Sequence, residues 1–214
     1  HIEKKVNVDV IVSGDSLWGA CDVKVDEAKR LNCDLIVMYG HVPFMKIDFP
    51  VVYMSVRYEK NIENDLNKIL PYLKKYKEIG LAASIQHTHQ LEKVKEFLEK
   101  NNKKTEIIGR KGHANEKGHI LGCEYNALKT LDVAAFLILG NRFHALGASL
   151  AVNKDVILLD IINEEIEEMN KFRDKIIKQR AVAVSNARNA RKFGIIIGLK
   201  EGQTFGSANF LKQK

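Results

Sequence analysis

Residues 133–160 read VAAFLILGNRFHALGASLAVNKDVILLD, and this stretch contains the pattern that decides the fold. Val133–Leu139 and Val156–Asp160 are continuous apolar runs of strand length, bounded by polar residues. Phe143–Val152 lies between them and has the apolar spacing of a helix, after a loop that begins at Gly140. Continuous apolar strands that alternate with helices are typical of a parallel sheet covered on both faces. The stretch therefore predicts an α/β fold.

The same alternation extends along the rest of the chain. Further strands are predicted at Val6–Val12, Asp34–Met38, Val51–Val56, Ile79–Ile85, Thr105–Gly109, Ile120–Cys123 and Phe193–Leu199. Further helices are predicted at Asp22–Leu31, Asn61–Tyr76, Gln90–Asn101 and Asn163–Lys192. Because two units follow a similar order, we expect repeated parallel-sheet units with helices on both faces.

This order suggests three homologous domains, with the third incomplete. We expect a first α/β domain at 1–72 that carries Cys21, and a second at 73–165 that carries Cys123. Residues 166–214 would form a linking helix and the start of a third α/β domain. The first predicted strand has no element before it, and the last has little after it, so we expect the chain to be trimmed at both ends.

Composition narrows the class of protein. A hydrophobic share of 45% with 29% charged residues is that of an ordinary soluble protein, and no apolar run approaches the ~20 residues of a membrane span. The N-terminal sequence has no secretion signal, so we expect a cytoplasmic protein. The formal net charge of +7 comes from lysines scattered over helices, and the basic cluster 110–119 lacks interleaved aromatics. We therefore expect no direct nucleic-acid binding.

The three cysteines occupy different kinds of position. Cys21 and Cys123 follow predicted strands, at the edge where ligands gather in parallel α/β sheets. Cys33 precedes a strand, so we expect an inert thiol at the opposite edge. On position alone, a cysteine at a strand end is more often a small core residue than a ligand. Thiolates suit iron-sulfur clusters and zinc, and closely spaced C-x-x-C pairs are absent, so a metal site would be assembled from distant segments.

Five ordered segments together resemble the archaeal diphthamide synthase family. They are GACDVKVDEA at 19–28, LIVMYGHVPF at 35–44, KGHILGC at 117–123, LGNRFHALGASLA at 139–151 and ARKFGIIIGLKEGQ at 190–203. The resemblance implies three α/β domains that each give one cysteine to a central 4Fe-4S cluster, with Cys21 and Cys123 as the first two ligands. The third ligand has no counterpart in this chain.

The same resemblance implies a transferase that catalyses the first step of diphthamide biosynthesis. It would cleave S-adenosylmethionine to a 3-amino-3-carboxypropyl radical, which adds to a histidine of translation elongation factor 2. The family also implies a homodimer and an electron donor from outside the protein. Two alternatives stay open: a quinolinate-synthase-like iron-sulfur enzyme, and a non-catalytic subunit that binds a partner or a nucleotide.

Other candidate site residues follow predicted strands. Gly140, Asn141, Arg142, Phe143 and His144 form a loop suited to holding a carboxylate or a sulfonium, although an ordinary helix start would look the same. His41 is placed to line the same cavity, and Gln203 to reach the amino-acid part of the substrate. The family usually has Gln where this chain has His119, which we interpret as a surface loop variant. We interpret His87 and His89 as surface or capping residues, with an H-x-H metal pair as the alternative.

Overall fold

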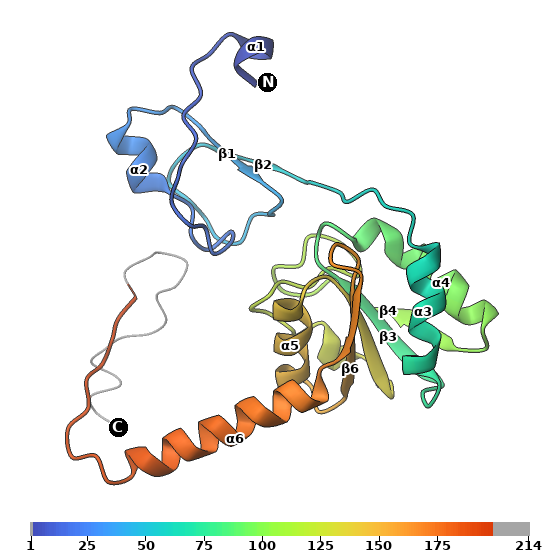
Figure 1. The fold of residues 1–214 in the computed structure, drawn as a ribbon. Helices are drawn as coiled ribbons and strands as arrows, with labels where there is room; N and C mark the ends of the chain where they lie inside the picture. The colour runs from blue at the N-terminus through green and yellow to red at the C-terminus, as the bar shows by residue number, and fades with distance from the viewer. Residues whose placement is uncertain (1, 199–214) are drawn as a thin grey trace.

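The computed structural model describes residues 2–198, which contain two separate sheets (Figure 1). The larger sheet has five strands in the order β4-β3-β5-β6-β7. The first four are mutually parallel, and β7 runs antiparallel to β6. The strands are β3 (Glu78–Ala83), β4 (Lys104–Ile107), β5 (Ala135–Leu139), β6 (Asp155–Asp160) and β7 (Glu165–Glu168).

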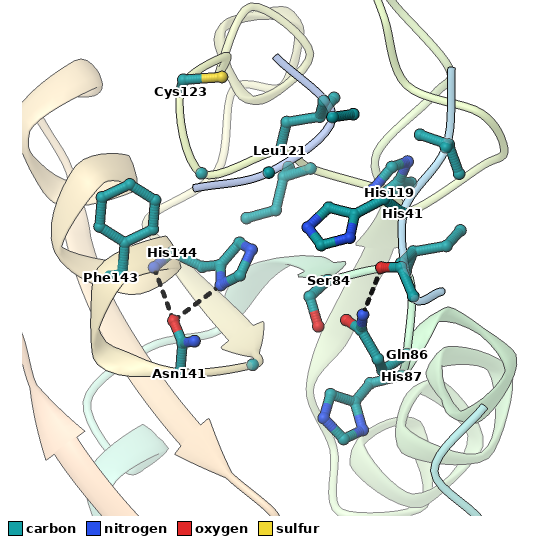
Figure 2. A pocket seen from close by; sticks show the side chains of 18 of the residues that line it. His41, Ser84, Gln86, His87, His119, Leu121, Cys123, Asn141, Phe143 and His144 are labelled. Atoms are coloured by element: carbon teal, nitrogen blue, oxygen red, sulfur yellow. Dashed lines mark hydrogen bonds between the residues drawn. The ribbon is translucent and has the colours of Figure 1, made fainter. Parts of the chain in front are cut away.

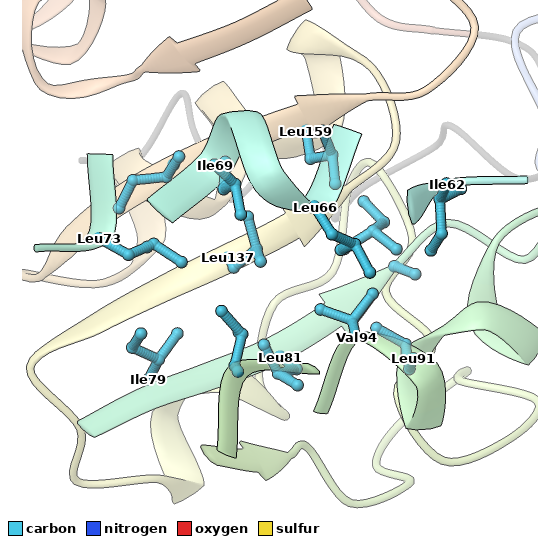
Figure 3. Packing of buried hydrophobic residues seen from close by; sticks show 14 of the residues in the cluster. Ile62, Leu66, Ile69, Leu73, Ile79, Leu81, Leu91, Val94, Leu137 and Leu159 are labelled. Atoms are coloured by element: carbon cyan, nitrogen blue, oxygen red, sulfur yellow. The ribbon is translucent and has the colours of Figure 1, made fainter. Parts of the chain in front are cut away.

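Helices cover both faces of this sheet, as the sequence predicts. One face packs against α3 (Glu63–Leu73) and α4 (Leu91–Lys100), and the other packs against α5 (Arg142–Ala151). Successive residues of β5 point to opposite faces: Leu137 joins the cluster under α3 and α4, and Phe136 joins the cluster under α5. Figure 3 shows the first cluster, with α3 lying across the strands.

Buried apolar residues explain why these helices form. In α4 the fully buried residues recur at helical spacing on one face, at Leu91, Val94 and Leu98. Burial of one such leucine contributes about 1.5–3 kcal/mol relative to exposure, so the sheet and its helices stabilise each other. The four parallel strands thus have a rigid carboxyl edge on which loops can be positioned.

The smaller sheet pairs β1 (Ile36–Tyr39) with β2 (Val51–Met54) in parallel, and Ile36 lies opposite Val51. Two short helices, α1 (Ile2–Val6) and α2 (Val25–Arg30), precede it in the chain. The segment after β2 leads to α3, and on the way the N–H of Tyr58 donates to the carbonyl of Gln86 (3.1 Å). The side chain of Gln86 in turn donates to the carbonyl of Gly40 (2.7 Å), which ties the loop after β1 to the loop after β3.

Three predicted elements are wrong. Val6–Val12 is not a strand: α1 ends at Val6, the following residues are irregular, and no neighbouring strand among residues 2–198 pairs with them. The described part of Phe193–Leu199 is also irregular, with Ile196 almost fully exposed (99%). Ile120–Cys123 is not a strand either: within this range only Leu121 forms an isolated bridge, with Glu124.

The helix predicted at Asn163–Lys192 divides into two elements. A hairpin turn follows β6, where the carboxylate of Asp160 accepts from the N–H groups of Ile162 (3.1 Å) and Asn163 (3.0 Å). The chain then pairs back on β6 as β7 and only afterwards forms α6 (Asn170–Ala187). The turn that Asp160 stabilises therefore prevents residues 163–169 from joining the helix, although their composition favours one.

The proposed boundaries 1–72 and 73–165 stay a prediction. Helix α3, which falls in the first of these ranges, packs on the five-stranded sheet through Leu66, Ile69 and Leu73. Helix α6 projects from this unit, and none of its residues is buried. None of the helices within residues 2–198 combines the length and the apolar character that a bilayer crossing requires.

Candidate functional site

A cavity of about 770 Å³ lies at the carboxyl edge of the five-stranded sheet, next to the loop that follows β1 (Figure 2). Its walls come from the segments after β1, β3, β4, β5 and β6, and from the turn before α2. The lining residues lie within 18–21, 40–44, 84–87, 119–123, 140–144 and 160–163. This is the edge at which loops and helix N-termini converge in a parallel sheet, and where ligands bind.

Cys21 lines the cavity from a tight turn. The N–H of Asp22 donates to the carbonyl of Gly19 (2.9 Å), and Gly19 has a φ of 147°. The carboxylate of Asp22 folds back to accept from the N–H of Trp18 (3.4 Å) instead of capping a helix. Helix α2 therefore begins at Val25, and Cys21 precedes it by one turn, so the predicted helix start at Asp22 is wrong.

Cys123 lines the same cavity from a second turn, between Leu121 and Glu124. The hydroxyl of Tyr125 donates to the carbonyl of Gly122 (2.7 Å), which fixes the backbone next to the thiol. Gly122 leaves room for the ring of Phe143, since a Cβ there would lie 2.0 Å from that ring. The turn is therefore held from two sides.

The two thiols share one electrostatic environment. Partial burial raises the pKa of Cys123, and the charges of Cys21 and Glu124 raise it further. Thiolates in such a setting are favoured when a cation binds between them. Cys33, in contrast, is half-buried just before β1 and lies outside the cavity lining, as predicted.

The donor set fits part of a soft metal centre. Two thiols that face one cavity suit an iron-sulfur cluster. Within residues 2–198, no group of three or more His, Cys, Asp or Glu side chains is placed to hold a metal ion. Cys21 and Cys123 could supply two ligands of such a group.

Four histidines also line the cavity: His41, His87, His119 and His144. Burial lowers the pKa of His119 to about 4, with the positive charge of Arg57 adding to the effect and Glu116 opposing it. The pKa of His144 is also lowered to about 4, first by desolvation and then by the nearby His119, His87 and His41. Both rings are therefore neutral at physiological pH.

His87 is buried and not at the surface, although it does occupy the N-cap position of the short 3₁₀ helix η1 (Thr88–Gln90). The predicted surface position of His119 is also wrong, whereas His89 is exposed as expected. Only 2% of His87 and 3% of His119 are exposed, because both sit in loops that return over the carboxyl edge of the sheet. His119 pairs with Ala83 at the end of β3 through an isolated parallel bridge. The place of His87 after a predicted strand was the signal that could have identified it. His119 directly precedes a predicted strand, so its position gave no such signal.

An ion pair that bonds to Ile85 of the cavity lining holds these loops in place. The guanidinium of Arg57, in the segment between the two sheets, donates to both carboxylate oxygens of Glu116 (2.8 and 3.0 Å) and to the carbonyl of Ile85 (2.5 Å). It also contacts the hydroxyl of Thr88. The N–H of His119 in turn donates to the carbonyl of Glu116 (3.2 Å). The network thus joins three segments that are distant in sequence.

The loop after β5 is placed as predicted, except for one side chain. Gly140, Asn141, Phe143 and His144 line the cavity, and Asn141 caps α5 by accepting from the N–H of His144 (3.2 Å). Arg142 is outside the lining, because its guanidinium binds the carboxylate of Glu167 on β7 (2.5 and 2.7 Å). His41 lines the cavity and also bonds to the backbone. Gln203 lies outside the described residues.

Several known proteins are similar to this chain. It is 29% identical to the 2-(3-amino-3-carboxypropyl)histidine synthase of Pyrococcus horikoshii, with 92% of this chain and 58% of that protein covered. It is 30% identical to the protein of the same name from Methanocaldococcus jannaschii, with 94% and 56% covered.

Solved structures show the same fold. The crystal structure of Dph2 from Pyrococcus horikoshii superposes with a TM-score of 0.84 at 27% identity, covering 99% of this chain and 62% of that one. A crystal structure of Dph2 from the same organism with a 4Fe-4S cluster gives a TM-score of 0.83 at 28% identity, with 95% and 60% covered. This chain therefore spans less than two thirds of the length of each of these proteins.

The family model described as "Putative diphthamide synthesis protein" matches residues 1–209, nearly the whole sequence. The α/β fold, with its mostly parallel sheet, agrees with that of the solved relatives. The chain belongs to the diphthamide synthesis protein family.

Proposed function

We propose that this chain is the larger part of a 2-(3-amino-3-carboxypropyl)histidine synthase. Such an enzyme transfers the 3-amino-3-carboxypropyl group of S-adenosylmethionine to a histidine of translation elongation factor 2. The observation that carries the proposal is that Cys21 and Cys123, from two different units of the fold, line one cavity. The family assignment favours this function over a quinolinate-synthase-like enzyme.

Cys21 and Cys123 would hold a 4Fe-4S cluster, the group that one crystal structure of Dph2 from Pyrococcus horikoshii contains. When bound, the cluster supplies the electron that cleaves the sulfonium of S-adenosylmethionine, after reduction by an external donor. The third cysteine ligand would lie outside residues 2–198. Binding of a cationic group would lower the pKa of Cys123, which burial and the charge of Cys21 now raise, so ligand binding and deprotonation are coupled.

The remaining lining residues would bind the substrate. None of the lining residues within 2–198 is a lysine or an arginine, and Asp160 contributes a buried carboxylate. This charge distribution suits a sulfonium, which carries a positive charge. Gly140, Asn141, Phe143 and His144 would form one wall and His41 the facing wall, with Gln203 as a further candidate contact.

The partners follow from the reaction. Elongation factor 2 would present its histidine at the mouth of the cavity, where Trp18 and Phe143 are 77% and 63% exposed. We propose a cytoplasmic homodimer, as the resemblance implies. Neither a membrane nor nucleic acid is needed for this chemistry.

Product analysis tests the proposal. Full-length protein, reconstituted anaerobically and reduced, should convert S-adenosylmethionine to 5′-methylthioadenosine, and Cys21→Ala should abolish the conversion. Cys33→Ala is the matched control and should retain it, because Cys33 lies outside the cavity. Formation of 5′-deoxyadenosine would contradict the proposed cleavage. Survival of function in Cys21→Ala would favour the non-catalytic subunit.

A further inference from the structure

Three histidines of the cavity, His41, His119 and His144, each have a hydrogen-bond partner at Nδ1 that determines which ring nitrogen carries the proton in the neutral form. A backbone N–H can only donate and a carbonyl can only accept, so the partner of ring Nδ1 determines which nitrogen carries the proton. Nδ1 of His119 accepts from the N–H of Asn115 (3.1 Å). The proton of neutral His119 therefore sits on Nε2, and this ring offers the cavity a donor.

His41 and His144 have the opposite arrangement. Nδ1 of His41 lies 3.0 Å from the carbonyl oxygen of Tyr39, so it must donate. Nδ1 of His144 lies 2.8 Å from Oδ1 of Asn141, an oxygen that already accepts from the N–H of His144, so this nitrogen donates too. In the neutral form both rings carry a lone pair on Nε2. They therefore offer the cavity two acceptors.

The cavity brings these acceptors together without a competing basic side chain in its described lining. Figure 2 shows the second ring nitrogen of His144 turned away from Asn141 and toward the cavity. Asp160, only 4% exposed, contributes a carboxylate to the lining, and none of the lining residues within 2–198 is a lysine or an arginine. The lowered pKa of His144, about 4, keeps its Nε2 available as an acceptor at neutral pH.

The geometry points to His41 and His144 as paired acceptors for the ammonium of a ligand that carries a free α-amino-acid head group. An ammonium has three N–H donors and can be shared between two acceptors, whereas a neutral imidazole or an alcohol has one donor. The inference rests on the proposed function, in which S-adenosylmethionine supplies this head group. It assigns the two histidines a role in specificity that does not depend on cluster chemistry.

The tautomers are measurable without ligand. Long-range ¹H–¹⁵N correlation spectra of histidine-labelled full-length protein at pH 8 should show His41 and His144 protonated on Nδ1, and His119 protonated on Nε2. Assignments come from the spectra of single His→Phe variants. Finding Nε2 protonated in His41 or His144 would overturn the inference, because that ring could not accept from an ammonium.

Ligand binding tests the role itself. Dissociation constants are measured at pH 8 without reductant for S-adenosylmethionine and for its analogue with hydrogen in place of the α-ammonium. Reconstituted wild-type protein should bind S-adenosylmethionine about tenfold more tightly or better, since hydrogen bonds to charged groups are the stronger kind. His144→Phe and His41→Phe should each reduce this preference. His144→Gln, which returns an acceptor near the position of Nε2, should restore part of it.

Two controls separate specificity from general damage. His119→Phe removes a donor and not an acceptor. It should therefore leave the preference for S-adenosylmethionine over its analogue unchanged, even where it weakens the binding of both ligands. His89→Phe, at an exposed position outside the cavity, should change neither constant. Equal binding of the two ligands by wild-type protein would overturn this inference but leave the proposed function intact. Failure of wild-type protein to bind either ligand would overturn both.

Discussion

At the residue scale, single glycines allow neighbouring side chains to approach the backbone more closely than a Cβ would permit. A Cβ at Gly80, in the middle of β3, would lie 2.4 Å from the fully buried ring of Phe136. Gly80→Ala should lower the free energy of unfolding by about 1–3 kcal/mol, the usual cost of overpacking a core. Gly14→Ala is the control, because a Cβ there would have no neighbour within 4 Å. Urea unfolding followed by circular dichroism measures both, and equal stabilities would refute the packing argument.

Buried histidines make stability depend on pH. The pKa of His119 is lowered from 6.5 to about 4, so between these values the unfolded chain binds a proton that the folded chain does not. The free energy of unfolding should therefore fall as the pH drops from about 6.5 toward 4, by about 3 kcal/mol for this residue. His119→Asn keeps an acceptor for the N–H of Asn115 but does not titrate.

His119→Asn should accordingly lose part of the pH dependence of stability, while His89→Asn should keep all of it because His89 is exposed. His87 and His144 contribute to the pH dependence that remains in His119→Asn, because their pKa values are lowered as well. Chemical unfolding at pH 7 and pH 5 gives the comparison. An unchanged slope in His119→Asn would show that His119 is not the titrating group.

Sequence patterns identify residues by position but not by orientation. Cys21, Cys123, His41 and the loop 140–144 were expected at one edge of the sheet and all line one cavity, although the strands predicted before Cys21 and at Cys123 do not form. The guanidinium of Arg142 turns instead to Glu167, on a strand that the sequence had suggested was helical. His87 and His119 were misplaced because polar loops resemble solvent-exposed turns until their tertiary contacts are known.

At the scale of elements, the Arg57–Glu116 pair connects the segment between the sheets to the loops after β3 and β4. Arg57→Ala would leave the carboxylate of Glu116 and the carbonyl of Ile85 without this donor. About 1–2 kcal/mol should be lost, since the pair is partly exposed and solvent weakens it. Lys104→Ala, which breaks the more exposed pair with Glu78, should cost less than about 0.5 kcal/mol.

The pKa of Glu116 provides a second measurement. It is lowered chiefly by the hydrogen bond from Arg57, so in Arg57→Ala it should rise toward its ordinary value. Carboxyl chemical shifts followed by NMR during an acid titration report this change. A Glu116 pKa that does not move would mean that the ion pair is absent in solution.

Elements with packed neighbours were predictable, and isolated ones were not. Strands β3, β5 and β6 were recognised because each is buried on both faces and reads as a continuous apolar run. Val6–Val12 is also rich in β-branched residues, but it has no partner strand among the described residues, and Val12 is 86% exposed. Composition can identify a strand only where the sheet to which it belongs is present.

At the scale of the whole molecule, the fold brings together two cysteines that are about a hundred residues apart in sequence. Cys21 lies in the turn before α2 and Cys123 in a turn after β4, so they can line one cavity only if the two sheets pack in the observed arrangement. The packing of helices on the five-stranded sheet does not depend on that arrangement. The proximity of the two cysteines therefore reports how the two sheets are placed relative to each other.

Thiol crosslinking tests this arrangement directly. A short bismaleimide added to cluster-free full-length protein should join the peptides that contain Cys21 and Cys123, because both thiols line one cavity and the charge of Cys21 raises the pKa of Cys123. Links from either one to Cys33 should be rare, since Cys33 lies outside the cavity. The reaction should accelerate as the pH rises from 7 to 9, because the pKa of Cys123 is raised and thiolate forms late. Mass spectrometry of the digest identifies the links, and crosslinks that join Cys33 as often as Cys123 would refute the shared cavity.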